Sequence, residues 1–404
     1  EELAAAAFVN NVFNLAIIFA TGFSYGLTPL IGMLQGGGNT QGIGRVFRNA
    51  LAANASVAVL LTAVMYTVYC FVDKLGQPEE LLPHIRPYFV LQLISLLFIM
   101  LFNGFRQFAE GLTDTRTPMW ILLGGNALNI FGNYLLIYGS FGFPEWGLFG
   151  AGVSTLVSRI VMLLVFIGVV AVARRYKVYR EAILRSRFNR NDFMQLNALG
   201  WPIALQMGME TAAFSLSAIM VGWLGSIPLA AHQIMISVST IGFMVYYGMG
   251  AALAVRVSHF MGQKDFPNLR RAVNSGMGII LSLAIVASLF FYLARTPIIY
   301  SFTEDHEVMI VVSSLIFSLI VYQFGDALQI TFANALRGTT DVKPMMWIAF
   351  FSYFIVALPV GYLCGFTWGG GVVGVWVAFP AGLFTAGFLF WLRFRYRLQQ
   401  LMKK

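Results

Sequence analysis

Two acidic residues lie inside long apolar stretches, and they are the residues best placed to do chemistry. Glu210 lies near the middle of residues 198–224, ALGWPIALQMGMETAAFSLSAIMVGWL, and Asp326 lies in SLIVYQFGDALQITF. A charged carboxylate at the centre of a bilayer costs roughly 2.5–3.5 kcal/mol or more, so such residues indicate function. Tyr322 precedes Asp326 by four residues and therefore shares its helical face. Together these groups suit the binding of a cation or a shared proton.

A second polar set consists of amides. Asn126, Asn129 and Asn133 lie in GGNALNIFGNYLLIYG, and Gln206 lies one helical turn before Glu210. We assign these four residues to a substrate cavity. For the asparagines, hydrogen bonding between packed helices is an open alternative. Arg159 also lies inside an apolar segment, and the sequence does not decide whether it faces a cavity or the membrane interface.

The segments that must carry these residues are apolar and long. Hydrophobic residues make up 58% of the 404 residues and charged residues 11%, whereas soluble domains are about 25% charged. Apolar segments fall at 3–34, 45–72, 85–108, 118–138, 148–173, 198–224, 228–260, 272–293, 308–336, 344–366 and 371–394. None alternates apolar and polar residues as β-barrel strands do. The sequence therefore predicts an all-α polytopic membrane protein. Cys70 and Cys364 are expected to pack in its core.

Basic residues predict the orientation. The link at 174–192, RRYKVYREAILRSRFNRND, and the tail RFRYRLQQLMKK are rich in Lys and Arg, so both are expected on the cytoplasmic side of a bacterial inner membrane. Arg337 and Lys343 are assigned to another cytoplasmic loop. Loops assigned to the outside carry Glu79 and Glu304 instead. The net charge of +9 is accordingly attributed to a basic membrane face and not to nucleic-acid binding.

The two halves of the chain form a parallel internal repeat. At an offset of 226 the repeat aligns Leu3-Ala-Ala with Leu229-Ala-Ala, Gly36 with Gly262, Arg45 with Arg271 and Pro118 with Pro344. The second copy begins with the Glu210 segment, which has no counterpart in the first. We therefore expect a native protein of twelve helices whose first helix is missing from this chain. The predicted domains are a five-helix bundle at 1–180, a linker at 181–197 and a six-helix bundle at 198–404.

Several motifs together resemble one transporter family. The second half reads Gly222-x-x-Gly225-x-x-x-Leu229-Ala-Ala-His-Gln and Tyr322-Gln-Phe-Gly-Asp326-Ala-Leu-Gln329. The first half reads Asn129-Ile-Phe-Gly-Asn133. In this order, over the whole length, they resemble the multidrug and toxic compound extrusion (MATE) family and its NorM-type branch.

The resemblance implies a fold and a function. It implies two six-helix bundles arranged as a V and alternating access between them. It implies a monomer in the membrane lipid, with no cofactor, that exports small amphipathic, mostly cationic drugs in exchange for Na⁺ or H⁺ and so gives antibiotic resistance. Glu210, Tyr322 and Asp326 match the family's cation-coupling residues, where Na⁺ could bind, and Asn129 and Asn133 match residues that line the first-half cavity.

Two other functions compete with drug antiport. A flippase of a lipid-linked precursor on the same superfamily fold would favour a strongly cationic cavity, whereas the mid-helix residues here are carboxylates and amides, with Arg159 the exception. An intramembrane enzyme would need a nucleophile with its base, or a metal motif. Gly22-x-Ser24-x-Gly26 fits a hydrolase pattern, but it lies in an apolar helix, and a chance match explains it better.

Overall fold

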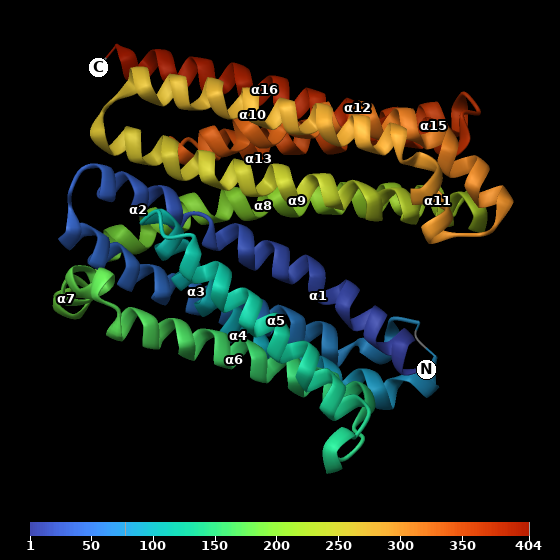
Figure 1. Ribbon diagram of the computed structural model, residues 1–404, viewed down its shortest axis with the longest axis horizontal. Coiled ribbons are helices and arrows are strands. Elements are labelled where there is room, and N and C mark those ends of the chain that lie inside the picture. Colours follow the sequence, from blue (N-terminus) through green and yellow to red (C-terminus); the bar gives the residue numbers. More distant parts are fainter. Residues whose placement is uncertain (77, 404) are drawn as a thin grey trace. The chain divides into compact units, whose positions relative to one another are not determined.

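The computed structural model describes residues 1–76 and 78–403, and every regular element in these residues is helical. The chain divides into two compact units, Glu1–Ala204 and Leu205–Lys404 (Figure 1). Eleven helical segments in the described chain are long and apolar enough to span a membrane, as the hydropathy pattern predicts. The predicted domain boundaries themselves stay a prediction. Each unit is described separately below.

The first unit contains seven helices and the beginning of an eighth. They are α1 (Glu2–Ser24), α2 (Leu27–Gly36), α3 (Thr40–Cys70), α4 (Leu82–Gly111), α5 (Arg116–Ile137), α6 (Gly147–Val172), α7 (Lys177–Arg185) and α8 (Arg190–Gly222). Helix α8 continues into the second unit. That unit adds α9 (Ser226–Gln263), α10 (Phe266–Leu293), α11 (Arg295–Phe302), α12 (His306–Gly338), α13 (Lys343–Phe350), α14 (Leu358–Tyr362), α15 (Gly371–Trp376) and α16 (Ala378–Met402). Two π-helical segments, Phe351–Ala357 and Leu363–Thr367, flank α14.

Close packing in the first unit depends on small residues, because apolar burial alone does not drive helices together in lipid. Helices α5 and α6 approach each other at Gly125 and Gly132. A Cβ atom at Gly125 would stand 2.3 Å from the sulfur of Met162, and one at Gly132 would stand 2.5 Å from the Ser154 hydroxyl. A larger residue at either position would require these side chains to move, so the two glycines allow α5 to pack closely against α6.

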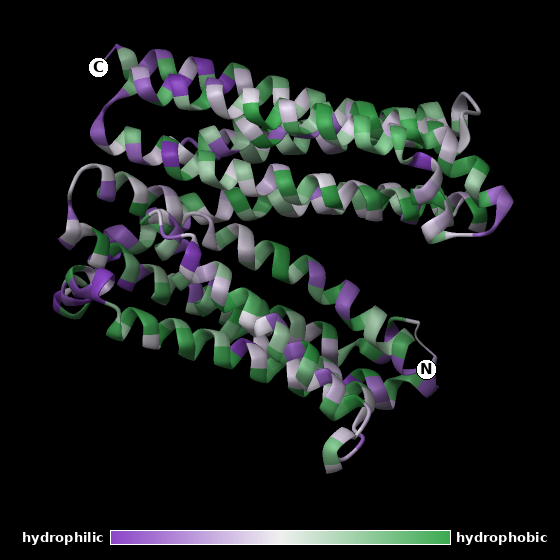
Figure 2. Ribbon diagram, viewed as in Figure 1, coloured by the Kyte–Doolittle hydropathy of each residue, from purple (hydrophilic) through white to green (hydrophobic). Residues whose placement is uncertain are grey.

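In the second unit, α12 is the central helix. It packs against α9, α10 and α16, and Figure 1 shows α10, α12 and α16 running side by side. Tyr246 of α9 and Ile280 of α10 join Ala327 and Ile330 of α12 in one buried cluster. Polar residues on α12 therefore lie inside the bundle, whereas Figure 2 shows hydrophilic residues gathered mainly at helix ends and in α7.

The structure repeats the same local motifs in both units. Asn39 caps α3 by accepting from Gly42 N at 2.8 Å, and Asp265, 226 residues later, caps α10 by accepting from Asn268 N at 3.1 Å. Helices α4 and α12 end alike. Each is followed by a threonine in the left-handed region, with φ values of 65° and 58° at Thr113 and Thr340, and then by an aspartate. These paired caps are the structural counterpart of the sequence repeat.

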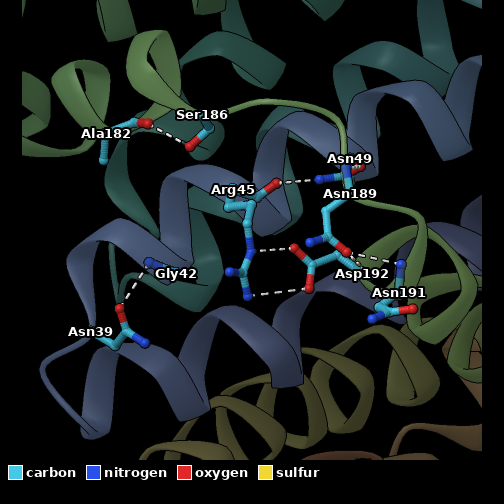
Figure 3. Close-up of polar contacts among 9 residues, drawn as sticks. All are labelled: Asn39, Gly42, Arg45, Asn49, Ala182, Ser186, Asn189, Asn191 and Asp192. Carbon is cyan, nitrogen blue, oxygen red and sulfur yellow. Dashed lines mark hydrogen bonds and ion pairs between the residues drawn. The ribbon is translucent and has the colours of Figure 1, made fainter.

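Polar contacts fix the connection between α7 and α8 (Figure 3). Asn189 accepts hydrogen bonds from the backbone N–H groups of Asn191 and Asp192, which stabilises the start of α8. Arg45 of α3 pairs with the Asp192 carboxylate through Nε at 2.5 Å and Nη2 at 3.4 Å. Asn49 of α3 accepts from the backbone of Asn189 at 2.9 Å. Helix α8 therefore starts from a fixed position on α3.

The aspartates after α4 and α12 each bind an arginine further along the chain. Asp341 pairs with Arg393 of α16 at 2.7 and 3.0 Å. Asp114 accepts from the Tyr176 hydroxyl at 2.5 Å and from Thr117 Oγ1 at 2.7 Å, and it pairs with Arg175 at 3.0 Å. Burial raises the pKa of Tyr176, and the hydrogen bond to Asp114 raises it further.

Asp114→Asn is expected to destabilise the protein by about 2 kcal/mol at pH 7, since it removes charge-assisted hydrogen bonds. Burial by itself would raise the pKa of Asp114, but the hydrogen bonds and Arg175 lower it below its ordinary value. The stabilisation is therefore complete above the ordinary pKa of an aspartate, and it is lost as the pH falls through the lower pKa of the folded state. Unfolding in detergent between pH 7 and pH 3 measures this loss. An equal loss of stability in Asp114→Asn at pH 7 and at pH 3 contradicts the assignment. Asp73→Asn, at an exposed position, serves as the control.

Two placements predicted from the sequence are wrong. Cys70 is exposed at the end of α3 and does not pack in the core. Arg337 does not lie in a loop with Lys343, because α12 continues to Gly338 and the Arg337 side chain is buried.

Candidate functional site

Glu210 of α8 is held by two amide side chains. Its Oε2 accepts a hydrogen bond from Gln206 Nε2 at 2.9 Å and another from Gln329 Nε2 at 3.1 Å. Gln206 lies one turn earlier on α8, whereas Gln329 comes from α12. The glutamate therefore joins the two helices, and one of its two oxygens is already engaged.

Arg337 is the functional-site residue that the sequence pattern missed. The residue is 6% exposed, and its Nη2 donates to Gln206 Oε1 at 2.7 Å. Because arginine can only donate, it orients the Gln206 amide so that the nitrogen faces Glu210. The result is a relay from Arg337 through Gln206 to Glu210. The helical spacing from Gln329 to Arg337, eight residues on one face, is the sequence signal that points to it.

Asp326 and Tyr322 lie on the same helix, one and two turns before Gln329. Both are buried, with exposed fractions of 1% and 5%. The Tyr322 ring packs edge-on against Phe214 and Phe379, with centroids 6.3 and 6.4 Å away. Within the described residues, Asp326 Oδ2 has no hydrogen-bond partner. The structure thus brings Glu210, Tyr322 and Asp326 into one region of the second unit, and their coupling roles stay a prediction.

The arrangement suits a monovalent cation. Two carboxylates and one guanidinium leave the site with a net negative charge when all are ionised. No group of three or more His, Cys, Asp or Glu side chains that could hold a metal ion occurs in the part of the chain that the structure describes. The site therefore lacks the ligand set of a transition metal.

Asn129 of α5 is the asparagine that hydrogen-bonds to α6. Asn129 Nδ2 donates to Ser154 Oγ and Thr155 Oγ1, both at 3.3 Å, and Asn133 Nδ2 donates to Asn129 Oδ1 at 3.4 Å. Asn126 is exposed on α5. The contacts of Asn129 match the packing alternative, whereas the hydrogen bond from Asn133 to Asn129 stays within α5. The cavity roles of all four amides, Gln206 included, stay predictions.

Arg159 faces a pocket of about 430 Å³ in the first unit. It donates from Nη1 to Gln92 Oε1 at 3.2 Å and to the Ser95 hydroxyl, both on α4. Asn10 and Thr155 also line the pocket, so it adjoins the Asn129 network. Arg159 forms no ion pair with any described carboxylate. The sequence did not decide between a cavity and the membrane interface for Arg159, and the structure places it beside a pocket.

Ser24 and His232 have packing contacts. Ser24, in the hydrolase-like pattern, donates to Asn54 Oδ1 at 2.8 Å and to the carbonyl of Ala20. His232 is 2% exposed and accepts from the indole of Trp376 at 3.1 Å, so it is a packed residue. Neither geometry is that of a nucleophile with a base.

Comparison with known proteins identifies the family of the chain. The family model described as MatE matches residues 1–135 and 202–363. Multidrug resistance protein NorM of Photobacterium profundum is 30% identical over 409 residues, covering 98% of this chain and 88% of the relative. NorM of Aliivibrio fischeri is 30% identical over 395 residues, covering 96% and 85%.

Solved structures match the fold. An outward-facing multidrug resistance MATE family transporter of the MOP superfamily matches with a TM-score of 0.90 at 20% identity, over 100% of this chain and 89% of its own. A MOP superfamily transporter from Pyrococcus furiosus, whose binding pocket has a reverse polarity that suggests a different function, matches at 0.86 and 19%, over 100% and 89%. The all-helical architecture is therefore that of MATE transporters, which are not enzymes. With the family model matching most of its length and two NorM proteins matching nearly all of it, the chain belongs to the MATE family of multidrug efflux transporters.

Proposed function

We propose that the chain is a secondary active antiporter that exports amphipathic, mostly cationic compounds in exchange for Na⁺ or H⁺ by alternating access. The observation that carries the proposal is the pair Glu210 and Asp326, two carboxylates on neighbouring membrane-spanning helices. Carboxylates in this position are expensive and are typical of ion pathways. A cation that binds there neutralises the charge and shifts the balance between two conformations by its difference in affinity for them.

The rival function, a lipid-linked-precursor flippase, would require a cavity that binds pyrophosphate. Arg159 is the residue that favours it, since its guanidinium lines a pocket without a paired carboxylate. The other polar residues that line this pocket are neutral amides and hydroxyls. A single guanidinium among such groups is a weak site for a highly charged anion. The buried site of the second unit is net negative instead when Glu210, Asp326 and Arg337 are all ionised.

The proposed cellular setting follows from charge and from the relatives. The basic link at 174–192 and the basic C-terminus would face the cytoplasm of a bacterial inner membrane. Export to the opposite side would confer resistance to antibiotics that are carried. Small organic cations are the proposed cargo, and a monomer is the proposed working unit.

Ethidium transport in proteoliposomes tests the proposal. A Na⁺ gradient and a pH gradient are imposed separately, and ethidium movement is followed by its fluorescence. Movement against the ethidium gradient that stops when the ion gradient is dissipated is the expected result. If neither gradient drives transport while the protein is folded and correctly inserted, the antiport proposal is wrong.

A further inference from the structure

A second pocket of the first unit lies at the start of α3, beside α7. Its volume is about 520 Å³, and it shares no lining residue with the Arg159 pocket. Arg45 of α3, Arg185 of α7 and Arg187, which follows α7, line it together with Glu181. The proposed antiport mechanism uses none of these residues, so the pocket needs an explanation of its own.

The pocket is positively charged. Arg185 and Arg187 are exposed, and neither forms a hydrogen bond or ion pair with any residue that the structure describes. Arg45 turns toward Asp192 and pairs with it through Nε and Nη2 (Figure 3). Glu181 and Asp192 therefore offset two of the three arginines, and one positive charge is left over. The first turn of α3 also lines the pocket, and the positive end of its helix dipole favours an anion further.

The two sides of the pocket are held together without a ligand. At Gly44 of α3 a Cβ atom would stand 2.5 Å from the backbone carbonyl carbon of Ala182, so the backbones of α3 and α7 touch there. Arg48 of α3 donates to the carbonyl oxygen of Ser186, just after α7. A pocket that is already formed loses little order when a ligand binds.

Apolar side chains stand beside the arginines and are not covered by the protein. Val178, which lines the pocket, is 59% exposed, and Leu184 and Phe188 are 74% and 60% exposed. Leu184 and Phe188 directly flank the segment from Arg185 to Arg187 in the sequence. Exposed apolar residues next to basic ones are typical of a segment that lies in the membrane interface. A free anion would use the arginines alone, whereas a phospholipid would use both kinds of side chain.

We propose that this pocket binds the phosphate of an anionic phospholipid, with Arg185 and Arg187 contacting the phosphate and Leu184 and Phe188 lying beside the acyl chains. Guanidinium groups match phosphate oxygens in geometry as well as in charge. The single surplus charge of the pocket equals the single charge of a phosphodiester. The proposed cytoplasmic position of the basic link agrees with this ligand, since anionic lipids of that leaflet attract basic segments beside the membrane.

Binding of tritiated dioleoylphosphatidylglycerol to the purified full chain tests the pocket, measured by scintillation proximity in detergent micelles at a salt concentration of about 0.15 M, where distant charges are screened. Saturable binding is expected. Unlabelled phosphatidylglycerol should compete with it, and phosphatidylcholine, whose headgroup has no net charge, should compete about tenfold more weakly.

The double variant Arg185→Gln/Arg187→Gln should lower the affinity for the labelled lipid about tenfold, because it removes both guanidiniums that contact the phosphate. The matched control is Lys177→Gln/Arg190→Gln. It removes the same charge from the same basic link, at exposed positions outside the pocket lining. Its affinity should change by about twofold at most.

Gln41→Glu tests the same pocket from the other side. Gln41 is exposed in the first turn of α3 and lines the pocket. A carboxylate there suits the start of the helix, so the protein should keep its unfolding temperature, but the new charge should repel the lipid phosphate and weaken binding. This variant keeps the test decisive if the double arginine variant does not fold.

Three results would overturn the assignment. Equal losses of affinity in the two double variants would mean that the lipid responds to the charge of the whole link and not to the pocket. Equal competition by phosphatidylcholine would exclude selection of an anionic headgroup. Displacement of the labelled lipid by inorganic phosphate at the concentrations at which phosphatidylglycerol competes would mean that the pocket takes the free anion. Ethidium transport is measured separately, so antiport and the lipid site can fail independently.

Discussion

Glu210→Gln or Asp326→Asn is expected to reduce ion-driven ethidium efflux in proteoliposomes at least tenfold, to the level of liposomes without protein. Each substitution keeps the size of the side chain and removes the charge that a coupling cation would neutralise. A cation then no longer binds one conformation more tightly than the other. A ligand without such a difference in affinity does not shift the equilibrium between the conformations. The initial rate of ethidium fluorescence change, normalised to the inserted protein, is the measurement.

The controls separate coupling from folding. Glu304→Gln removes an exposed carboxylate outside the membrane-spanning helices, and it should leave efflux unchanged. Size-exclusion profiles and thermal unfolding must show that the two inactive variants fold. Normal efflux by folded Glu210→Gln and by folded Asp326→Asn would remove these carboxylates from the mechanism.

Hydropathy and helical spacing predicted much of this architecture. A segment that crosses lipid must satisfy its own backbone hydrogen bonds, so it forms a long helix with mostly apolar side chains. The apolar runs of the sequence therefore located the eleven candidate spans of the described residues. The four-residue spacing placed Tyr322 and Asp326 on one face, since that spacing is a property of a single helix. Features fixed within one segment are thus readable from the sequence.

Contacts between helices were not readable in the same way. The bond from Gln329 to Glu210 depends on how α12 is shifted and rotated against α8, and packing over the whole unit sets that register. A close approach at Gly325, where a Cβ would lie 3.0 Å from Leu383, is one of the constraints. Sequence spacing in α12 alone contains no such information.

Arg337 shows where a sequence rule misleads. Basic residues beside membrane spans usually mark a cytoplasmic loop, so an arginine in the last turn of α12 resembles a flanking charge. Its side chain is long enough to reach back along the helix, and it ends on Gln206 inside the unit. Arg159 is a different case, since the sequence left open whether it faces a cavity or the membrane interface, and only the structure shows its partners on α4.

The relay from Arg337 to Glu210 predicts a strong energetic coupling. Arg337→Met should destabilise the folded protein by about 3–5 kcal/mol, because Gln206 Oε1 loses its donor and the Glu210 carboxylate loses its nearest buried cation. Glu210→Gln alone should also destabilise, because it removes the negative charge that interacts with the Arg337 guanidinium. The double variant removes both charges together. Its loss of stability is therefore expected to be about 0.5–3 kcal/mol smaller than the sum of the two single losses.

Denaturant unfolding in mixed micelles, followed by tryptophan fluorescence, measures the four corners of this cycle. The matched control combines Glu210→Gln with Arg393→Met. Arg393 also pairs with a carboxylate in the second unit, but its partner is Asp341, so the effects of these two substitutions should add. Additivity in the Arg337 cycle as well would mean that Gln206 does not transmit the charge of Arg337, and Glu210 would then be held by its two amide donors alone.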